Sequence, residues 1–249
     1  MRHRSVLIIA HRGASAVAPE STRAAILEAI QARSHMIELD VQMTQDERLV
    51  VFHDERLERT TDAVGRLANV RYSQIAHLDA GAWFDDRFRG EQILLLSQAL
   101  KLIPGRVGVN LELKTTKNYI AMLHRLALLL KRQRAQAHRQ VLLSSFDSKL
   151  INYALLAGYN RALICRNDPE LSLRKAMHIG CSAWHPAYEL VTPRLVAEAH
   201  SIGLRVNAWT VDKVEIARRL IRWGIDGLFT NNPARLRHLI SSRNRHDNV

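Results

Sequence analysis

Short apolar runs in this 249-residue chain end repeatedly in charged or titratable residues. An apolar run with β-branched residues predicts a buried strand, and charge beside a buried core is costly unless it is paired or holds a metal. Four such strand ends in the first half of the chain indicate one assembled site. The residues at these ends are His11, Arg12, Glu38, Asp40, His53, Asp54, Glu112 and Lys114.

Three carboxylates in this set have the chemistry of a site for a divalent cation. Glu38 and Asp40 are two residues apart on one expected strand, so both side chains point to the same side of it. Glu112 lies on another expected strand, and oxygen ligands without cysteine favour Mg²⁺ or Ca²⁺ over zinc. Internal ion pairs with Arg12 and Lys114 are the alternative for the same carboxylates.

The remaining residues of the set add what phosphoester cleavage needs. His11 and His53 titrate near neutral pH and together could serve as general acid and base, although a single strand-end histidine is more often structural. Arg12 and Lys114 provide positive charge suited to a phosphate. A hard cation and these two side chains would stabilise charge on the phosphorus oxygens while the histidines move protons.

Apolar runs and amphipathic segments alternate along the chain, and these elements must position the site. Such alternation is typical of βαβ units and a parallel sheet, and eight strands in ~250 residues favour an α/β fold of the TIM (β/α)₈ barrel type. In that barrel the C-terminal strand ends converge on one face. The expected strands are 6–10, 36–41, 107–113, 141–144, 162–165, 182–184, 204–209 and 227–230, with helices over 22–33, 119–132, 148–156, 193–201 and 214–223.

One segment departs from this alternation. Residues 44–48 are polar and turn-like, and the apolar run 49–52 leads directly to His53, which leaves no room for a helix. We therefore expect a hairpin that returns from the second strand, followed by a small insertion over residues 55–106. No linker divides the chain, so residues 1–249 are expected to form one domain. Ser21 is the expected N-cap of the helix over residues 22–33.

The charge of the chain is strongly basic, with 36 Lys and Arg against 24 Asp and Glu, a net charge of +12. Such a balance favours an anionic partner: a phosphorylated small molecule, nucleic acid or a membrane surface. The basic clusters at residues 131–139 and 235–245 contain no aromatic residue for base stacking, which argues against nucleic acid.

The apolar runs and the cysteines bear on where the protein works. No run approaches the ~20 apolar residues that a transmembrane helix requires. The first apolar run is also too short for a signal peptide. Cys165 and Cys181 lack metal-ligand spacing, and we expect both to be reduced thiols of a cytoplasmic protein.

Several motifs resemble those of the glycerophosphodiester phosphodiesterase family, in its bacterial cytoplasmic type. They follow the family's order from residue 6 to about residue 236, and the ordered set is more specific than any one motif. The resemblance implies a TIM barrel that hydrolyses glycerophosphodiesters to sn-glycerol 3-phosphate and an alcohol. The matching segments are residues 11–15, 19–22, 38–41, 53–61, 111–114, 145–146, 208–211 and 226–230.

The resemblance also implies a role for individual residues. Trp209 matches an aromatic side chain on the glycerol side of the family's pocket, although a buried strand tryptophan is the alternative. Residues 55–106 correspond to the family's small insertion over the barrel mouth. The implied metal ligands are Glu38, Asp40 and Glu112, the implied acid/base pair is His11 and His53, and the implied substrate contacts are Arg12, Lys114 and Trp209.

Four sites depart from the family pattern, one of them residues 93–96, where Ile-Leu-Leu-Leu replaces the usual Ile-Pro-Thr-Leu. Ser21 stands where asparagine is usual, Glu47 where a turn glycine is usual, and Asn231 where aspartate often follows Thr230. We expect Ser21 to change how the first loop is braced near His11, and Glu47 to change the type of the hairpin turn. These departures bear on substrate fit more than on catalysis.

The leading prediction is therefore metal-dependent hydrolysis of a small glycerophosphodiester in the cytoplasm, with Mg²⁺ or Ca²⁺ as the cofactor. The second hypothesis is a lysophospholipase D-like activity on lipid phosphodiesters, because the basic surface would suit an anionic interface. A non-catalytic barrel that binds anions through its basic surface is the third. The sequence leaves the alcohol and the oligomeric state open.

Overall fold

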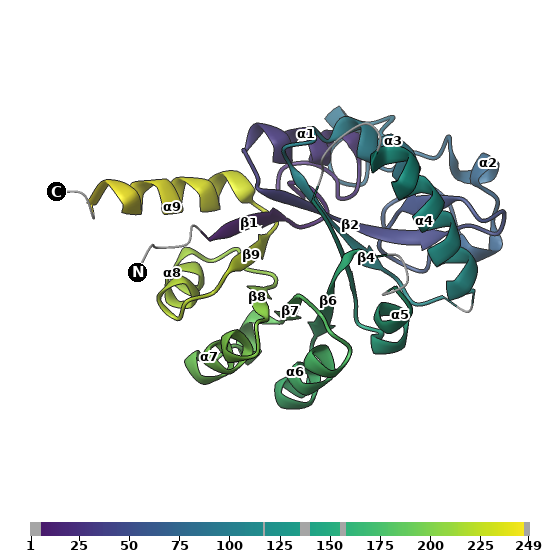
Figure 1. Cartoon of the computed structure of the whole chain (residues 1–249). Coiled ribbons are helices and arrows are strands. Elements are labelled where there is room, and N and C mark those ends of the chain that lie inside the picture. The colour runs from purple at the N-terminus through teal and green to yellow at the C-terminus, as the bar shows by residue number, and fades with distance from the viewer. Residues whose placement is uncertain (1–5, 117, 135–139, 155–157, 247–249) are drawn as a thin grey trace.

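Eight parallel strands of the protein close into a barrel (Figure 1). The computed structural model describes residues 6–116, 118–134, 140–154 and 158–246. Strand β1 (Leu7–Ala10) closes the ring, because it pairs with both β2 (Met36–Met43) and β9 (Gly227–Thr230). The predicted (β/α)₈ barrel is confirmed. The other barrel strands are β4 (Gly108–Leu113), β5 (Val141–Ser145), β6 (Asn160–Cys165), β7 (Ala183–Pro186) and β8 (Arg205–Ala208).

Helices surround the barrel and bury their apolar sides against the strands (Figure 1). Two of them, α6 (Pro169–His178) and α9 (Pro233–His246), were not among the predicted helices. The start of α6 carries two ordinary signals: Asp168 accepts from Leu171 N as the N-cap, and Pro169 occupies the first turn. The helices that follow barrel strands are α1 (Arg23–Gln31), α4 (Tyr119–Arg134), α5 (Ser148–Tyr153), α6 (Pro169–His178), α7 (Pro193–Ser201), α8 (Val214–Arg222) and α9 (Pro233–His246).

Helix α1 begins one residue later than predicted. The hydroxyl of Thr22 accepts a hydrogen bond from Ala25 N at 3.3 Å, so Thr22 is the N-cap and the assignment to Ser21 is wrong. Ser21 instead has a φ of 63°, and its buried hydroxyl has no partner within the described residues. This left-handed conformation is one that asparagine adopts more readily than serine. The departure at Ser21 therefore adds local strain to the first loop.

The predicted hairpin extends β2 beyond the barrel. Strand β3 (Leu49–Val51) pairs antiparallel with the end of β2. Glu47 in the connecting turn has a φ of 56°, the left-handed region that glycine favours. The Glu47 carboxylate also lies 2.7 Å from the guanidinium of Arg125 on α4.

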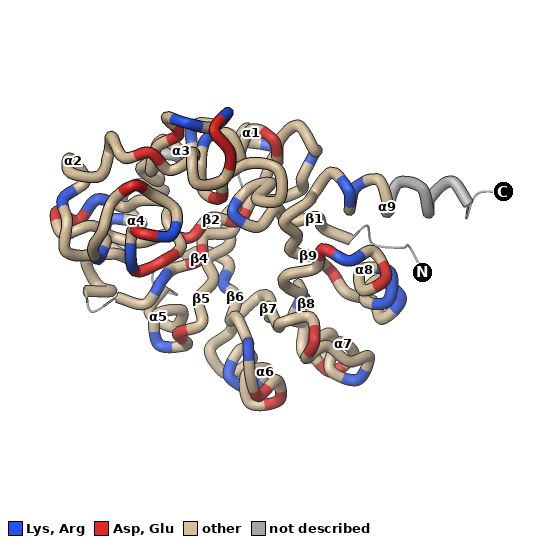
Figure 2. Tube along the Cα trace, turned by 180° about the vertical axis from the view of Figure 1, so that it is seen from behind, with Lys and Arg blue, Asp and Glu red and all other residues tan. Residues whose placement is uncertain are grey.

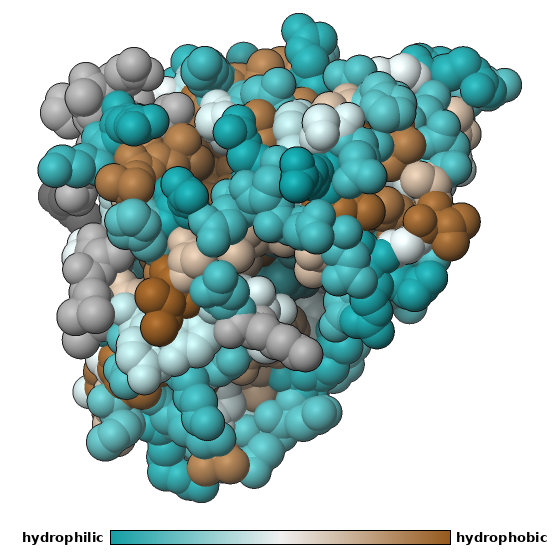
Figure 3. Space-filling model, turned by 90° about the vertical axis from the view of Figure 1, so that its right-hand side faces the viewer, coloured by the Kyte–Doolittle hydropathy of each residue, from teal (hydrophilic) through white to brown (hydrophobic). Residues whose placement is uncertain are grey.

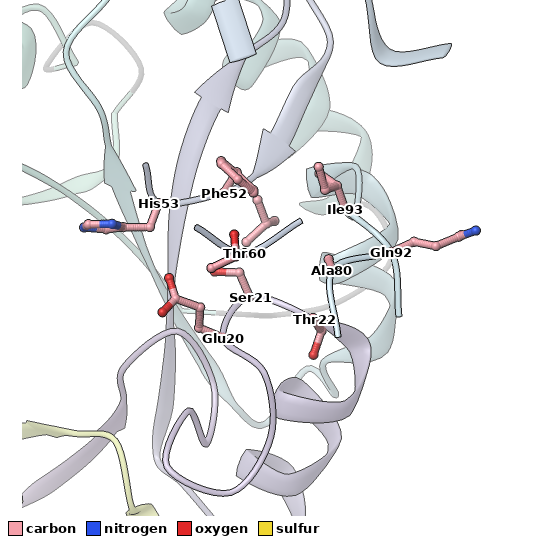
Figure 4. A pocket seen from close by; sticks show the side chains of 10 residues that line it. Glu20, Ser21, Thr22, Phe52, His53, Thr60, Ala80, Gln92 and Ile93 are labelled. Atoms are coloured by element: carbon pink, nitrogen blue, oxygen red, sulfur yellow. The ribbon is translucent and has the colours of Figure 1, made fainter. Parts of the chain in front are cut away.

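The insertion after β3 packs around an apolar cluster of its own on the β2–β3 side of the barrel (Figure 1). It contains the short helices η1 (Leu67–Asn69), α2 (Tyr72–Ile75) and η2 (Asp86–Phe88) and ends at α3 (Leu96–Leu102). A small pocket lies between this insertion and the first loop (Figure 4). In that view Ser21 and Thr60 lie close together, whereas Gln92 points away.

The outer surface mixes charges of both signs. Lys and Arg share the outer helices with Asp and Glu (Figure 2), and one face shows hydrophobic side chains only as small patches among hydrophilic ones (Figure 3). Within the described residues, no helix has the length and apolar character needed to cross a membrane. Both cysteines are free thiols, Cys165 buried and Cys181 partly exposed.

Candidate active site

The residues singled out in the sequence meet at the C-terminal ends of the barrel strands. A cavity of about 40 Å³ lies there, and seven of the eight predicted site residues line it. Asp40 lies beside it, buried under the side chains of Arg12 and Lys114. The cavity residues among the predictions are His11, Arg12, Glu38, His53, Glu112, Lys114 and Trp209.

The three predicted metal ligands form one cluster. Strands β2 and β4 are parallel neighbours with Asp40 opposite Glu112, and each ligand residue places an oxygen within 4.8 Å of the other two. Glu38 Oε1 and Asp40 Oδ2 are buried and make no hydrogen bond within the described residues. A buried carboxylate oxygen without a donor is stabilised by a cation, and Glu38 Oε1 has neither a donor nor an ion pair within the described residues, so this donor set fits a hard divalent ion.

Two basic side chains adjoin the same cluster. Lys114 Nζ lies 2.7 Å from Asp40 Oδ1 and 2.5 Å from Glu112 Oε1. Arg12 Nε lies 3.2 Å from Asp40 Oδ2 without hydrogen-bond geometry, and the Arg12 backbone N–H donates to Glu38 Oε2 at 2.8 Å. When all three carboxylates are ionised, the two basic side chains neutralise the cluster only in part.

Burial and neighbouring charges separate the pKa values of these groups. Burial, with repulsion from Asp40 and Glu112, raises the pKa of Glu38 well above its usual value. Burial and Asp40 likewise raise the pKa of Glu112. Burial also acts to raise the pKa of Asp40, but attraction to Lys114 and Arg12 outweighs it and leaves that pKa below its usual value. Asp40 is therefore the carboxylate that stays charged most readily.

His11 is oriented by a chain of hydrogen bonds that begins at Asn231, just after the neighbouring strand β9. Its Nδ1 lies 2.8 Å from Asn231 Oδ1, while Asn231 Nδ2 donates to Asp212 Oδ2 at 2.7 Å. Because Asp212 fixes which end of the amide faces His11, Nδ1 must donate and Nε2 is left as an acceptor. Burial and the charge of Arg12 lower the pKa of His11 to about 4, which keeps the ring neutral at pH 7.

His53 has a carboxylate partner instead. Its Nδ1 lies 2.5 Å from Asp54 Oδ1, so Asp54 braces the ring. Arg59 pairs with both Asp54 and Glu20, and Glu20 also accepts from Arg12 at 3.0 Å. Glu20 and His53 lie on the same side of the small pocket in Figure 4. Burial lowers the pKa of His53, while Asp40 and Asp54 oppose that change.

An aromatic wall lines the other side of the cavity. Phe146 follows β5 and Trp209 follows β8, with ring centroids 5.6 Å apart in an edge-to-face arrangement. Arg166 follows β6, and its guanidinium carbon lies 5.4 Å from the Phe146 centroid and 5.3 Å from the Trp209 centroid. Trp209 Nε1 donates to the carbonyl of His185 at 2.8 Å. The sequence analysis did not identify Arg166 as a residue of this cavity, and the only signal for it was its position directly after an apolar run.

This fold and this site define the class of the protein: a TIM-barrel hydrolase of phosphate esters. Comparison with known proteins narrows the class. Residues 11–235 match the glycerophosphoryl diester phosphodiesterase family. The chain belongs to this family and is a phosphoric diester hydrolase, so the resemblance seen in the sequence is confirmed.

Individual relatives resemble nearly the whole chain. A glycerophosphodiester phosphodiesterase of Caldanaerobacter subterraneus subsp. tengcongensis is 34% identical over 238 residues, which cover 94% of this chain and 97% of the relative. A phosphodiesterase of Oleispira antarctica, solved with its product sn-glycerol-3-phosphate, superposes with a TM-score of 0.89 at 28% identity, covering 94% and 96% of the two chains. A glycerophosphodiester phosphodiesterase structure from Agrobacterium tumefaciens gives a TM-score of 0.80 at 28% identity, covering 95% and 99%.

Proposed function

We propose that the protein hydrolyses glycerophosphodiesters to sn-glycerol 3-phosphate and an alcohol with a divalent cation, Mg²⁺ or Ca²⁺, at Glu38, Asp40 and Glu112. The proposal rests on the buried carboxylate cluster, in which two oxygens accept no hydrogen bond within the described residues. It rests also on the two histidines that line the adjoining cavity. The product bound to the similar Oleispira antarctica phosphodiesterase supports the choice of product.

The hydrogen bonds of the two histidines favour different roles for them. The Nδ1–H of His11 donates a hydrogen bond to Asn231, so the neutral ring has its lone pair at Nε2. This tautomer suits a general base that accepts a proton from the attacking oxygen. His53 has a carboxylate at Nδ1 that stabilises the imidazolium, which suits a general acid that protonates the leaving alcohol.

The other groups of the site would bind and stabilise the phosphate. Arg12 and Lys114 line the cavity and offer N–H donors to the oxygens of the phosphate. A cation bound by the carboxylates would add positive charge where negative charge develops on the phosphorus oxygens. Either a water or a hydroxyl of the substrate's own glycerol could be the attacking group.

We further propose that the substrate is a small molecule and that the enzyme works in the cytoplasm. The two free cysteines support a reducing compartment. The small volume and polar catalytic side of the cavity support a compact, deacylated substrate. The substrate panel should include a lysophospholipid, because the competing hypothesis is a lysophospholipase D-like activity.

A direct test measures release of sn-glycerol 3-phosphate from glycerophosphocholine and glycerophosphoethanolamine with Mg²⁺, Ca²⁺ or EDTA. We expect activity with a divalent cation and none with EDTA. His11→Ala and Glu38→Ala should each lower kcat at least about 100-fold, since each removes a group that acts on the reacting atoms. The exposed His124→Ala and Glu28→Ala are the matched controls. Full activity in either site variant would refute the site assignment.

A further inference from the structure

The insertion places one arginine between two loops on the catalytic side of the barrel mouth. The guanidinium of Arg59 pairs with Asp54, which follows His53 after β3, and with Glu20 in the loop after β1. Glu20 and His53 come from separate segments of the chain (Figure 4). We propose that Arg59 is a positioning residue for the reaction, which orients His53 through Asp54 and Arg12 through Glu20. The inference rests on the proposed function and adds to it a residue that does not line the cavity.

The guanidinium of Arg59 uses two of its edges, one for each carboxylate. Its Nη1 donates to Glu20 Oε2 at 3.0 Å, and its Nη2 donates to Glu20 Oε1 at 2.6 Å. Its Nε donates to Asp54 Oδ2, and Nη2 also donates to Asp54 Oδ1 at 3.1 Å. A planar guanidinium with two engaged edges fixes the direction of each carboxylate, which a point charge would not do.

Asp54 transmits this orientation to His53. Its Oδ1 lies 2.5 Å from His53 Nδ1, while Arg59 holds its Oδ2. The side chain of Asp54 is 25% exposed, so without Arg59 the carboxylate would be free to turn toward water and away from the imidazole. The backbone is fixed independently, because the Gln42 amide donates to the carbonyls of Phe52 and Asp54. Arg59 therefore acts on the side-chain rotation of Asp54 and not on the path of the chain.

Glu20 transmits the orientation to Arg12. Its carboxylate accepts from Arg12 Nη1 at 3.0 Å, and Arg12 Nε lies 3.2 Å from Asp40 Oδ2. Burial acts to raise the pKa of Glu20, but hydrogen bonds from Arg59 and attraction to Arg12 outweigh it and leave that pKa below its usual value. Charges therefore alternate along one chain of contacts between the carboxylate cluster and the second histidine: Asp40, Arg12, Glu20, Arg59, Asp54 and His53.

The exposure of Arg59 indicates that its ion pairs orient groups more than they stabilise the fold. Its side chain is 44% exposed, and exposed ion pairs contribute little to stability. The backbone on either side is fixed without them, since Leu57 and Thr60 are buried. Thr61 also donates to the Leu57 carbonyl through both its N–H and its hydroxyl. Loss of the guanidinium should therefore leave the fold intact and release the two carboxylates.

Arg59→Met tests the proposal with two substrates that share the glycerol phosphate half and differ in the leaving group. Glycerophosphocholine releases an alcohol that needs a proton from the general acid, whereas sn-glycerol 3-(4-nitrophenyl) phosphate releases a phenolate that needs none. Because Arg59 orients the acid His53, kcat should fall about 10- to 100-fold for glycerophosphocholine and change little for the nitrophenyl substrate. KM should rise by the same factor for both substrates, since Arg12 binds the phosphate that they share.

Two further variants assign each effect to its carboxylate. Glu20→Gln should reproduce the rise in KM and leave kcat little changed. In an Asp54→Ala background, Arg59→Met should cost no further kcat, because the contact that leads to His53 is already lost. Arg66→Met is the matched control, since it removes another exposed arginine of the insertion, whose ion pair is with Glu55 at 3.1 Å.

Four results would overturn the proposal: unchanged kinetics in Arg59→Met, an equal loss of kcat with both substrates, a further loss in the Asp54→Ala background, or the same losses in Arg66→Met. A wild-type protein that cleaves neither substrate would refute the proposed function instead. The NMR signal of the His53 Nδ1–H proton, assigned by its disappearance in His53→Ala, would then decide the positioning separately. A hydrogen-bonded signal that is present in the wild type and lost in Arg59→Met supports it. A signal that persists in the variant, or is absent from the wild type, overturns it.

Discussion

Glu38→Gln should make the metal-free protein more stable and insensitive to divalent cations. Glu38 is buried, and its carboxylate has an oxygen within 4.8 Å of an oxygen of Asp40 and of Glu112. Two unit charges at that distance repel by about 3 kcal/mol at an effective dielectric constant of about 20. Glutamine removes this repulsion and still accepts the hydrogen bond from Arg12 N.

The net gain in stability should be smaller than the pairwise repulsion. The raised pKa of Glu38 means that a proton relieves part of the repulsion at every pH below the raised value. We therefore expect the free energy of unfolding to rise by about 1–2 kcal/mol, which for a chain of this length raises Tm by about 2–8 °C.

Thermal unfolding in EDTA and in millimolar Mg²⁺ or Ca²⁺ measures this effect. The wild type should gain stability on adding cation, because a ligand that binds only the folded state shifts the equilibrium toward it. Glu38→Gln should start higher in EDTA and gain little. Exposed Glu28→Gln should behave like the wild type. A lower Tm for Glu38→Gln in EDTA, together with an undiminished response to cation, would refute the reasoning.

Three further predictions follow from the same contacts. Glu38 and Glu112 have raised pKa values in the metal-free folded state, so these two groups bind more protons there than in the unfolded chain between pH 4.5 and the raised values. Their contribution to stability should therefore fall as pH rises through that window. A series of Tm measurements in EDTA on the wild type and Glu38→Gln checks this, and an equal pH dependence of the two proteins would contradict it. Asn231→Ala should lower kcat about 10- to 100-fold with little change in KM, because His11 loses the acceptor that fixes its tautomer; unchanged kcat in steady-state assays would contradict this. Gly13→Ala should cost about 2–4 kcal/mol in urea denaturation, since φ is +83° and the new Cβ would lie 2.7 Å from the backbone of Ala25; a wild-type midpoint would contradict it.

Much of the barrel could be predicted because its signals are local. Each barrel strand is a short apolar run, and the residues that end it point into the mouth through the alternation of side chains along a strand. The pairs Glu38–Asp40 and Glu112–Lys114 therefore identified the polar side of the mouth without any knowledge of pairing. The ends of helices were predicted less accurately, because they depend on the orientation of one capping side chain. The N-cap of α1 is Thr22 and not the predicted Ser21.

Contacts between distant parts of the chain were decided by the tertiary structure alone. Asn231 lies 220 residues from His11, and only closure of the barrel between β1 and β9 brings its amide to the imidazole. The contacts of Arg166 with Phe146 and Trp209 also form only in the folded barrel, because these two residues follow other strands.

The sequence by itself thus determined the residue types at the strand ends and the class of chemistry they serve. Which nitrogen of each histidine is free, which carboxyl holds a proton and which ring faces are covered depended on the folded arrangement. The physical reason is that hydrogen-bond direction, burial and charge act over a few ångströms in space, and the barrel brings residues to that distance from strands far apart in the chain.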